Sequence, residues 1–254
     1  MLRNYFSVIA RNILRNKTYS LINLLGLSLG TAVCLIILQY VRFEESFDTF
    51  HSKADHLYRV IREFTNSDGL TQRDAAQFAP AGEALKSTFP EVTGYVRITP
   101  EYSKVVLSHN DRKFEVDKVY YADSTFFSLF DFKLLQGDRT NVLTDARSVV
   151  ISRTTAEKYF GPMDSWQESP IGKILVMNNN EVLKVTGIME DFPANSHFRA
   201  NALLSFTTFL LHNDPSQFWG WNDFYTYIDL KPGTDYKRFE SKLPGIIAKY
   251  KGKD

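Results

Sequence analysis

The fold of this 254-residue chain is decided by residues 21–41, LINLLGLSLGTAVCLIILQYV. They lie within the 24 uncharged residues between Lys17 and Arg42. At about 1.5 Å per residue, an α-helix of this length crosses a hydrocarbon layer of roughly 30 Å. The apolar part of a secretory signal is shorter and precedes a small-x-small cleavage site, which residues 39–43 do not offer. The stretch therefore predicts a retained transmembrane helix.

The charges that flank this helix predict its orientation. Four basic residues precede it, and no Asp or Glu occurs before Glu44. By the positive-inside rule the N-terminus is cytoplasmic, and residues after about 42 lie on the outer side. When the four basic residues before the helix are left out, 26 Lys and Arg remain against 29 Asp and Glu. The exported part therefore carries a net charge of about −3. This charge gives no reason to expect a nucleic-acid partner.

The cysteine content favours one compartment. Cys34 is the single cysteine and lies inside the predicted span, so the exported part contains no thiol and forms no disulfide. A region as long as residues 42–254 buries enough apolar surface to fold without one. The composition therefore favours a bacterial inner membrane with a periplasmic domain over an animal cell surface, where disulfides are common.

Residues 1–17 have an amphipathic pattern of their own. Apolar side chains recur at helical spacing on one face, at Leu2, Phe6, Ile9 and Ile13. The pattern predicts a helix that lies on the cytoplasmic face of the membrane, with its basic residues towards anionic lipid. A frayed cytoplasmic tail is the alternative.

Within the span, Gly26 and Gly30 form a G-x-x-x-G pattern. Small residues four positions apart allow a second helix to approach closely and gain van der Waals contact. The pattern predicts a membrane-helix packing surface, although glycine is frequent in membrane helices and chance explains the spacing equally well.

Residues 18–50 are predicted to form the transmembrane helix and its periplasmic extension. No Gly or Pro occurs from Thr31 to Phe50, so we expect a continuous rod. Phe43, Phe47 and Phe50 recur at helical spacing and should pack the emerging helix against the domain or the lipid interface.

The remaining chain predicts an α+β region with two subdomains, because strand-helix alternation is mixed with hairpins. Strands are expected over 56–64, 92–98, 203–206 and 224–230, and hairpins over 104–122, turning at 109–112, and over 173–190, turning at 178–180. Helices are expected over 81–89, over 124–132 with Ser124 as N-cap, over 153–160 closed by Gly161, and over 235–250 interrupted by Pro244.

No catalytic, cofactor or metal site is predicted. Residues 170–173, PIGK, lack the remaining positions of a phosphate-binding loop, and no serine lies in a nucleophile elbow. His51 and His56 have no cysteine or paired carboxylate to complete a metal site. Glu44, Glu45 and Asp48 are expected to be solvated helix residues, and the tryptophans at 219 and 221 to be core anchors.

Several motifs carry a resemblance to a known family. The opening IARNILRNKTYSLINLLGLSLGTAVCLII resembles the first membrane helix of MacB/FtsX-like ABC transporter permeases. FDTFHSKADHLYRV is similar to the start of the periplasmic domain in the large permeases of Bacteroidetes-type bacteria. SVVISRTTAEKYFG, SPIGKIL and VTGIMEDFPANSHF follow in the order and spacing of the MacB-like periplasmic core domain.

The resemblance implies an architecture and a set of partners. Residues 51–254 would be a MacB-like periplasmic core domain, with a porter part at about 55–99 and 198–254 and a sabre-like part at about 100–197. The chain would be a noncatalytic permease subunit that works with a cytoplasmic ABC ATPase subunit, a second permease copy and a periplasmic adaptor. ATP-driven motion of the membrane helix would move the periplasmic domain, which handles export or envelope substrates.

The resemblance also implies three further membrane helices and a last porter strand that this sequence does not contain, which makes the chain a fragment by the family pattern. The alternative function is a membrane-anchored extracellular sensor or binding module that signals through the same helix. Nothing in residues 42–254 identifies a transported substrate.

Overall fold

The computed structural model describes residues 11–12, 14–65, 68–214 and 219–250. The chain divides into two compact units, Met1–Phe47 and Asp48–Asp254. The second unit combines one large sheet with short helices, which confirms the predicted α+β class. The first unit contains the predicted N-terminal apolar helix.

The first unit contains the apolar helix α2, Lys17–Glu45. In the part of the chain that the structure describes, it is the single helix long and apolar enough to cross a membrane. None of its side chains is buried. Two of its polar side chains are satisfied within the helix, because Ser28 Oγ donates to the Leu25 carbonyl at 3.0 Å and Thr31 Oγ1 to the Leu27 carbonyl at 2.8 Å. At these two positions the helix surface suits a lipid or helix environment.

The amphipathic segment predicted for residues 1–17 falls largely outside the described residues. Residues 11, 12, 14 and 15 are helical, and Asn16 interrupts the helix before α2 with φ −114° and ψ 56°. A break at this position separates the two predicted helices.

The prediction of a continuous helix to Phe50 is wrong. Helix α2 ends at Glu45, and residues 46–50 form turns. Asp48 has φ 57°, a left-handed conformation that a regular α-helix excludes. Its backbone N–H donates to the carbonyl of Asn195 at 3.0 Å, so the second unit holds this residue out of the helix.

The sheet of the second unit has twelve strands, of which ten follow one path, β1-β14-β5-β8-β13-β10-β12-β11-β6-β7. The second unit starts with β1 (Leu57–Arg59), β2 (Arg62–Thr65), β3 (Thr71–Asp74), β4 (Ala76–Gln77), α3 (Ala81–Thr88) and β5 (Val92–Pro100). Its last described elements are β14 (Phe224–Leu230), α7 (Tyr236–Glu240) and α8 (Pro244–Tyr250). Strand β14 lies between β1 and β5 and is antiparallel to both, so β1 and β5 run parallel. The expected β-α-β unit is therefore present with an inserted central strand.

Two local boundaries in this part differ from the prediction. The single strand expected over 56–64 is divided into β1 and β2, because β2 leaves the large sheet and pairs with β3. The helix expected to reach Phe89 ends at Thr88, since Phe89 precedes a proline and takes an extended conformation. The final helix is interrupted as predicted, with Pro244 as the first residue of α8.

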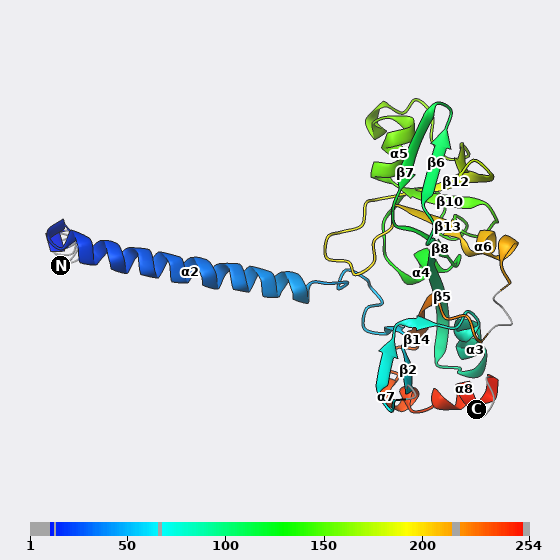
Figure 1. Cartoon of the computed structure of the whole chain (residues 1–254), viewed down its shortest axis with the longest axis horizontal. Coiled ribbons are helices and arrows are strands. Elements are labelled where there is room, and N and C mark those ends of the chain that lie inside the picture. Colours follow the sequence, from blue (N-terminus) through cyan, green and yellow to red (C-terminus); the bar gives the residue numbers. More distant parts are fainter. Residues whose placement is uncertain (1–10, 13, 66–67, 215–218, 251–254) are drawn as a thin grey trace. The chain divides into compact units, whose positions relative to one another are not determined.

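The middle of the chain supplies the other strands and helices. These are β6 (Val105–His109), β7 (Arg112–Val116), β8 (Val119–Ala122), α4 (Phe126–Leu129), β9 (Leu134–Gln136), β10 (Ser148–Ser152), α5 (Arg153–Phe160), the 3-10 turn η1 (Met163–Ser165), β11 (Ile174–Met177), β12 (Glu181–Met189), β13 (Ala202–Ser205) and α6 (Phe206–His212). Figure 1 shows α5 with β6 and β7 at one end of this unit, and α3, α7 and α8 at the other.

The hairpin predicted over 173–190 is confirmed as β11-β12. The hairpin predicted over 104–122 is present as β6-β7 but ends at Val116, because residues 119–122 form β8, which pairs with β5 and β13. Helix α5 is opened by the Ser152 hydroxyl, which accepts from the Thr155 backbone, and closed by Gly161 at φ 85°. The prediction that Ser124 is the N-cap of α4 is wrong. The N-cap residue is Thr125, whose hydroxyl donates to the Tyr95 carbonyl at 2.6 Å instead of capping the helix.

The core lies on the two faces of the sheet in three apolar clusters. The tryptophans at 219 and 221 are half-buried and pack against Phe78 and Phe224, with ring centroids 5.7 and 5.5 Å apart. They lie at the edge of the core, so their prediction as core anchors is confirmed only in part. Strand β5 crosses the predicted boundary at residues 99 and 100, and the division into porter and sabre-like parts stays a prediction.

Candidate functional site

The candidate site is the segment that opens the second unit, residues 48–57, which we call the joint segment. It consists of successive turns that lead into β1. Three groups of side chains attach it to distant parts of the domain.

The first attachment is formed by Asp48. Its carboxylate accepts from the Ser196 hydroxyl at 3.2 Å, from the His197 backbone N–H at 3.3 Å, and from His197 Nδ1 at 2.5 Å. Both side chains of the Asp48–His197 pair are about one-third exposed. Charge-assisted hydrogen bonds with this partial burial are stronger than those between fully exposed groups.

His197 extends this attachment into the sheet. Its Nε2 lies 2.7 Å from the hydroxyl of Tyr227, a buried residue of β14. Burial raises the pKa of Tyr227 to about 12, so the phenol is neutral and can donate a hydrogen bond to the imidazole. Asp48, His197 and Tyr227 thus form a chain of hydrogen bonds from the joint segment to β14, the strand next to the edge strand β1.

The second attachment joins His51 and Ser52 to Asp131. The Ser52 backbone N–H donates to the Asp131 carboxylate, and the Asp131 backbone N–H donates to His51 Nδ1 at 3.0 Å. The two segments are therefore linked reciprocally. Burial opposes ionisation of Asp131, but the hydrogen bonds from Ser52 outweigh it and lower the pKa of this carboxyl below its ordinary value.

His51 is 5% exposed and is enclosed by aromatic rings. Its ring centroid lies 4.2 Å from that of Phe50, 4.9 Å from Phe132 and 5.2 Å from Phe130. Because Nδ1 accepts a hydrogen bond, the neutral ring carries its proton on Nε2, which has no partner among the described residues. Burial lowers the pKa of His51, although the charges of Asp48 and Asp131 oppose that shift.

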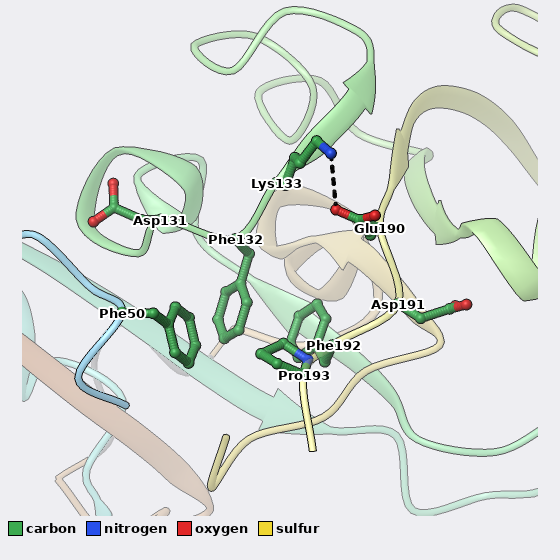
Figure 2. A pocket seen from close by; sticks show the side chains of 8 residues that line it. All are labelled: Phe50, Asp131, Phe132, Lys133, Glu190, Asp191, Phe192 and Pro193. Atoms are coloured by element: carbon green, nitrogen blue, oxygen red, sulfur yellow. Dashed lines mark ion pairs between the residues drawn. The ribbon is translucent and has the colours of Figure 1, made fainter. Parts of the chain in front are cut away.

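Phe50 contributes the apolar part of the second attachment. Figure 2 shows its ring beside Phe132, which in turn lies against Phe192. The ring centroids of Phe50 and Phe132 are 5.7 Å apart, and Phe132 stacks on Phe192 at 3.9 Å with an interplanar angle of 11°. This row of rings connects the joint segment with two loops of the domain.

A shallow pocket of about 250 Å³ lies over these rings. The charged groups around it do not converge, since Figure 2 shows the carboxyl groups of Asp131 and Asp191 pointing away from the rings. Lys133 and Glu190 pair with each other at 3.1 Å, and Thr154 donates to Asp191. No nucleophile with an adjacent base lines the pocket, and the described residues contain no cluster of three metal-ligating side chains.

The third attachment is made to Asp229 of β14. Lys53 Nζ and His56 Nδ1 lie 3.0 and 2.7 Å from its two carboxylate oxygens. Burial alone would raise the pKa of Asp229, but the hydrogen bonds from Lys53 and His56 lower it below the ordinary value. The carboxylate is therefore ionised and holds the end of the joint segment next to the strand that β1 pairs with.

The residues predicted from the sequence are placed as follows. Gly26 and Gly30 lie on α2, where an added Cβ would meet no atom within 4 Å, so their packing role stays a prediction. His51 and His56 are separate attachment points, because His51 accepts from the Asp131 backbone N–H and His56 binds the Asp229 carboxylate. Asp48 is not a solvated helix residue, because it binds His197.

The sequence reasoning missed the partners of the joint segment, namely Asp131, His197, Tyr227 and Asp229. Asp131 and Asp229 occur within expected elements and carry no local signal. His197 lies in the motif VTGIMEDFPANSHF, which was noted for its resemblance and not for a contact. Asp131, His197 and Asp229 lie at least 79 positions from the joint-segment residue they bind, and Tyr227 lies 30 positions from His197, so no local pattern could identify the pairs.

Comparisons with known proteins agree with this fold. A family model described as MacB-like periplasmic core domain matches residues 20–246. A comparison with curated proteins gives no match. Among solved structures, a domain of a protein from Porphyromonas gingivalis, described as a permease protein, is similar with a TM-score of 0.67 and 23% identity over 80% of this chain and 84% of that one.

A second solved structure is the periplasmic region of MacB from Actinobacillus actinomycetemcomitans. It is similar with a TM-score of 0.55 and 16% identity over 85% of this chain and 90% of that chain. At these identities the two structures show a shared fold. The family model covers most of the sequence, including the joint segment and the strands that hold it, and the chain therefore belongs to the family of MacB-like periplasmic core domains.

Proposed function

We propose that this chain is a noncatalytic permease subunit of an ABC transporter, in which motion of α2 reaches the periplasmic domain through the joint segment. Membership of the MacB-like family supports a permease-type role. A domain of this family behind one apolar N-terminal helix fits a protein of the inner membrane. The N-terminus is cytoplasmic and residues after about 42 are periplasmic on this proposal.

The observation that carries the proposal is the threefold attachment of the joint segment. Only Ser46 and Phe47 separate the end of α2 from Asp48, the first attached residue. Residues 48–56 then bind two loops and strand β14. A displacement at the end of α2 therefore acts on three parts of the domain within nine residues, and this replaces the continuous rod that the sequence suggested.

The proposed partners follow from the permease role. A cytoplasmic ABC ATPase subunit supplies ATP hydrolysis, a second permease copy completes the transporter, and a periplasmic adaptor can receive the substrate. The domain itself requires no cofactor, metal or nucleic acid for this role, and the transported substrate is an export or envelope molecule.

The alternative is a membrane-anchored sensor or binding module. Photo-cross-linking from the cytoplasmic side separates the two functions. A photoreactive amino acid replaces Asn12, and a matched control replaces Asp111 in the β6-β7 turn; both positions are exposed. On the permease proposal, the adduct at position 12 contains an ABC ATPase, identified by its nucleotide-binding motifs, and the adduct at position 111 does not.

A kinase or methyl-accepting protein cross-linked at position 12 would support the sensor instead. An ABC ATPase captured equally from position 111 would contradict the proposed orientation.

A further inference from the structure

A groove of about 330 Å³ lies in the part of the domain that contains β2, α3 and α8 (Figure 1). Its volume is within the range of sites that bind small molecules. No residue of the joint segment lines it. Its walls are mainly apolar and include Val60, Phe78, Leu85, Trp219, Leu243 and Ile246. The charged residues Arg62, Glu63, Arg73 and Glu240 also line it.

Gln77 supplies a polar group on this apolar wall. It belongs to β4, pairs with Phe224 through the backbone, and lines the groove. The residue is 6% exposed, yet its Nε2 has no hydrogen-bond partner among the described residues. A buried amide without a hydrogen-bond partner lowers the stability of the folded state. In a native protein such a group indicates a water or ligand that accepts the missing hydrogen bond.

Arg62 also lines the groove and supplies a second donor without a partner among the described residues. Its Nη2 donates to the Asp74 carboxylate at 3.0 Å, and its guanidinium lies 5.4 Å from the ring centroid of Phe78. Its Nε is buried without a partner in the described part of the chain. The groove therefore combines apolar walls with two N–H donors that lack an acceptor.

We propose that this groove binds an apolar acyl chain that carries one amide or ester group. The carbonyl oxygen of that group would accept from Gln77 and Arg62, and the alkyl chain would cover the apolar walls. A peptide fits less well, because it carries an amide at every residue and the apolar walls would leave most of those groups unpaired. The binding site is separate from the joint segment and does not depend on the proposed coupling.

Trp219 lines the groove and can report on occupancy. The full chain in lipid nanodiscs is titrated with 8-bromo-N-methyloctanamide, which carries one amide, because bromine quenches tryptophan fluorescence at short range. Empty nanodiscs give the background. We expect saturable quenching in the wild type and loss of that component in Trp219→Phe, which retains the tryptophans at 166 and 221.

A pair of substitutions tests the role of the polar group. Gln77→Leu keeps the volume but removes the amide, so the dissociation constant for the probe should rise roughly tenfold, the cost of about one hydrogen bond. Gln72→Leu is the matched control, since Gln72 is exposed on β3 and does not line the groove; its dissociation constant should equal that of the wild type.

Three results would overturn the proposal: no saturable quenching in the wild type, equal affinity of Gln77→Leu and wild type, or tighter binding of a brominated apolar tripeptide than of the acyl probe. If Gln77→Leu does not fold, Ile61→Glu replaces it. Ile61 lines the groove and is 46% exposed, so the substitution is compatible with folding. A carboxylate at this position should weaken probe binding, and unchanged binding would contradict the proposed site.

Discussion

At the scale of single residues, Asp48 shows why the helical conformation of α2 does not continue into the joint segment. An aspartate tolerates the left-handed conformation at φ 57° better than most residues, and its carboxylate gains hydrogen bonds from Ser196 and His197 in that position. These bonds compensate for the helical hydrogen bonds that are lost beyond Glu45. The end of α2 is therefore a tertiary effect and not a consequence of local helix propensity.

The Asp48–His197 pair should contribute measurably to stability. Asp48→Ala and His197→Ala should each lower the free energy of unfolding by about 1–2 kcal/mol, because each breaks a partly buried, charge-assisted hydrogen bond. The double variant should lower the free energy of unfolding by less than the sum of the two single losses. Urea unfolding of the full chain in detergent, followed by tryptophan fluorescence, measures these values.

The exposed pair Lys104–Glu115, at 2.6 Å, provides the control. Glu115→Ala should change the unfolding free energy by less than about 0.5 kcal/mol, since exposed ion pairs contribute little. Strict additivity of the Asp48 and His197 variants would contradict a direct interaction.

The buried His51 should make stability depend on pH. Its pKa is lowered in the folded state, whereas an unfolded histidine titrates near 6.5, so the unfolded state binds more protons as the pH falls below that value. We expect the melting temperature to decrease from pH 7.5 to 5.5. His51→Asn keeps an acceptor for the Asp131 N–H and should show a smaller decrease. Equal decreases in both proteins, measured by circular dichroism, would contradict a buried neutral histidine.

At the scale of elements, local turn chemistry explains which predictions succeeded. Asn110 and Asn178 have φ 50° and Asn179 has φ 65°, so the asparagines that marked the two hairpins adopt left-handed turn conformations. Helix α5 likewise has its cap residues next to it in the sequence. Signals of this kind act within a few residues and can be recognised without a structure.

The failures have the opposite origin. Helix α2 stops at Glu45 without a Gly or Pro because a loop nearly 150 residues later binds Asp48. Strand β2 leaves the main sheet because β3 is a competing partner. The candidate site was missed for the same reason, since each of its contacts joins residues that are distant in sequence.

The glycine pattern of α2 makes a prediction about helix packing. If two copies meet through Gly26 and Gly30, Cys34 continues the same face at i+4 spacing and should form an intermolecular disulfide in oxidised membranes. Gly30→Leu should reduce that cross-link several-fold, because its side chain fills space that is empty around the described helix. Ala32→Leu adds bulk on the opposite face and should leave the yield unchanged. Equal yields from both variants would exclude this packing surface.

At the scale of the whole molecule, the chain offers a direct test of its membrane topology. Cys34 is the single cysteine, so Cys34→Ala gives a cysteine-free background. A membrane-impermeant maleimide should label Asp111→Cys in intact spheroplasts and should label Asn12→Cys only after lysis. Both positions are exposed, so access to the reagent depends on the side of the membrane alone. The reverse labelling pattern would contradict the proposed orientation.

The order of strands in the sheet has a consequence for synthesis. Strand β1 has β14 as its partner in the sheet, and Asp229 of β14 holds Lys53 and His56. A chain made from its N-terminus therefore exposes β1, Lys53 and His56, without their partners, until some 170 later residues have emerged. Until that point the third attachment cannot form, so the joint segment can be held only by its contacts to the two loops.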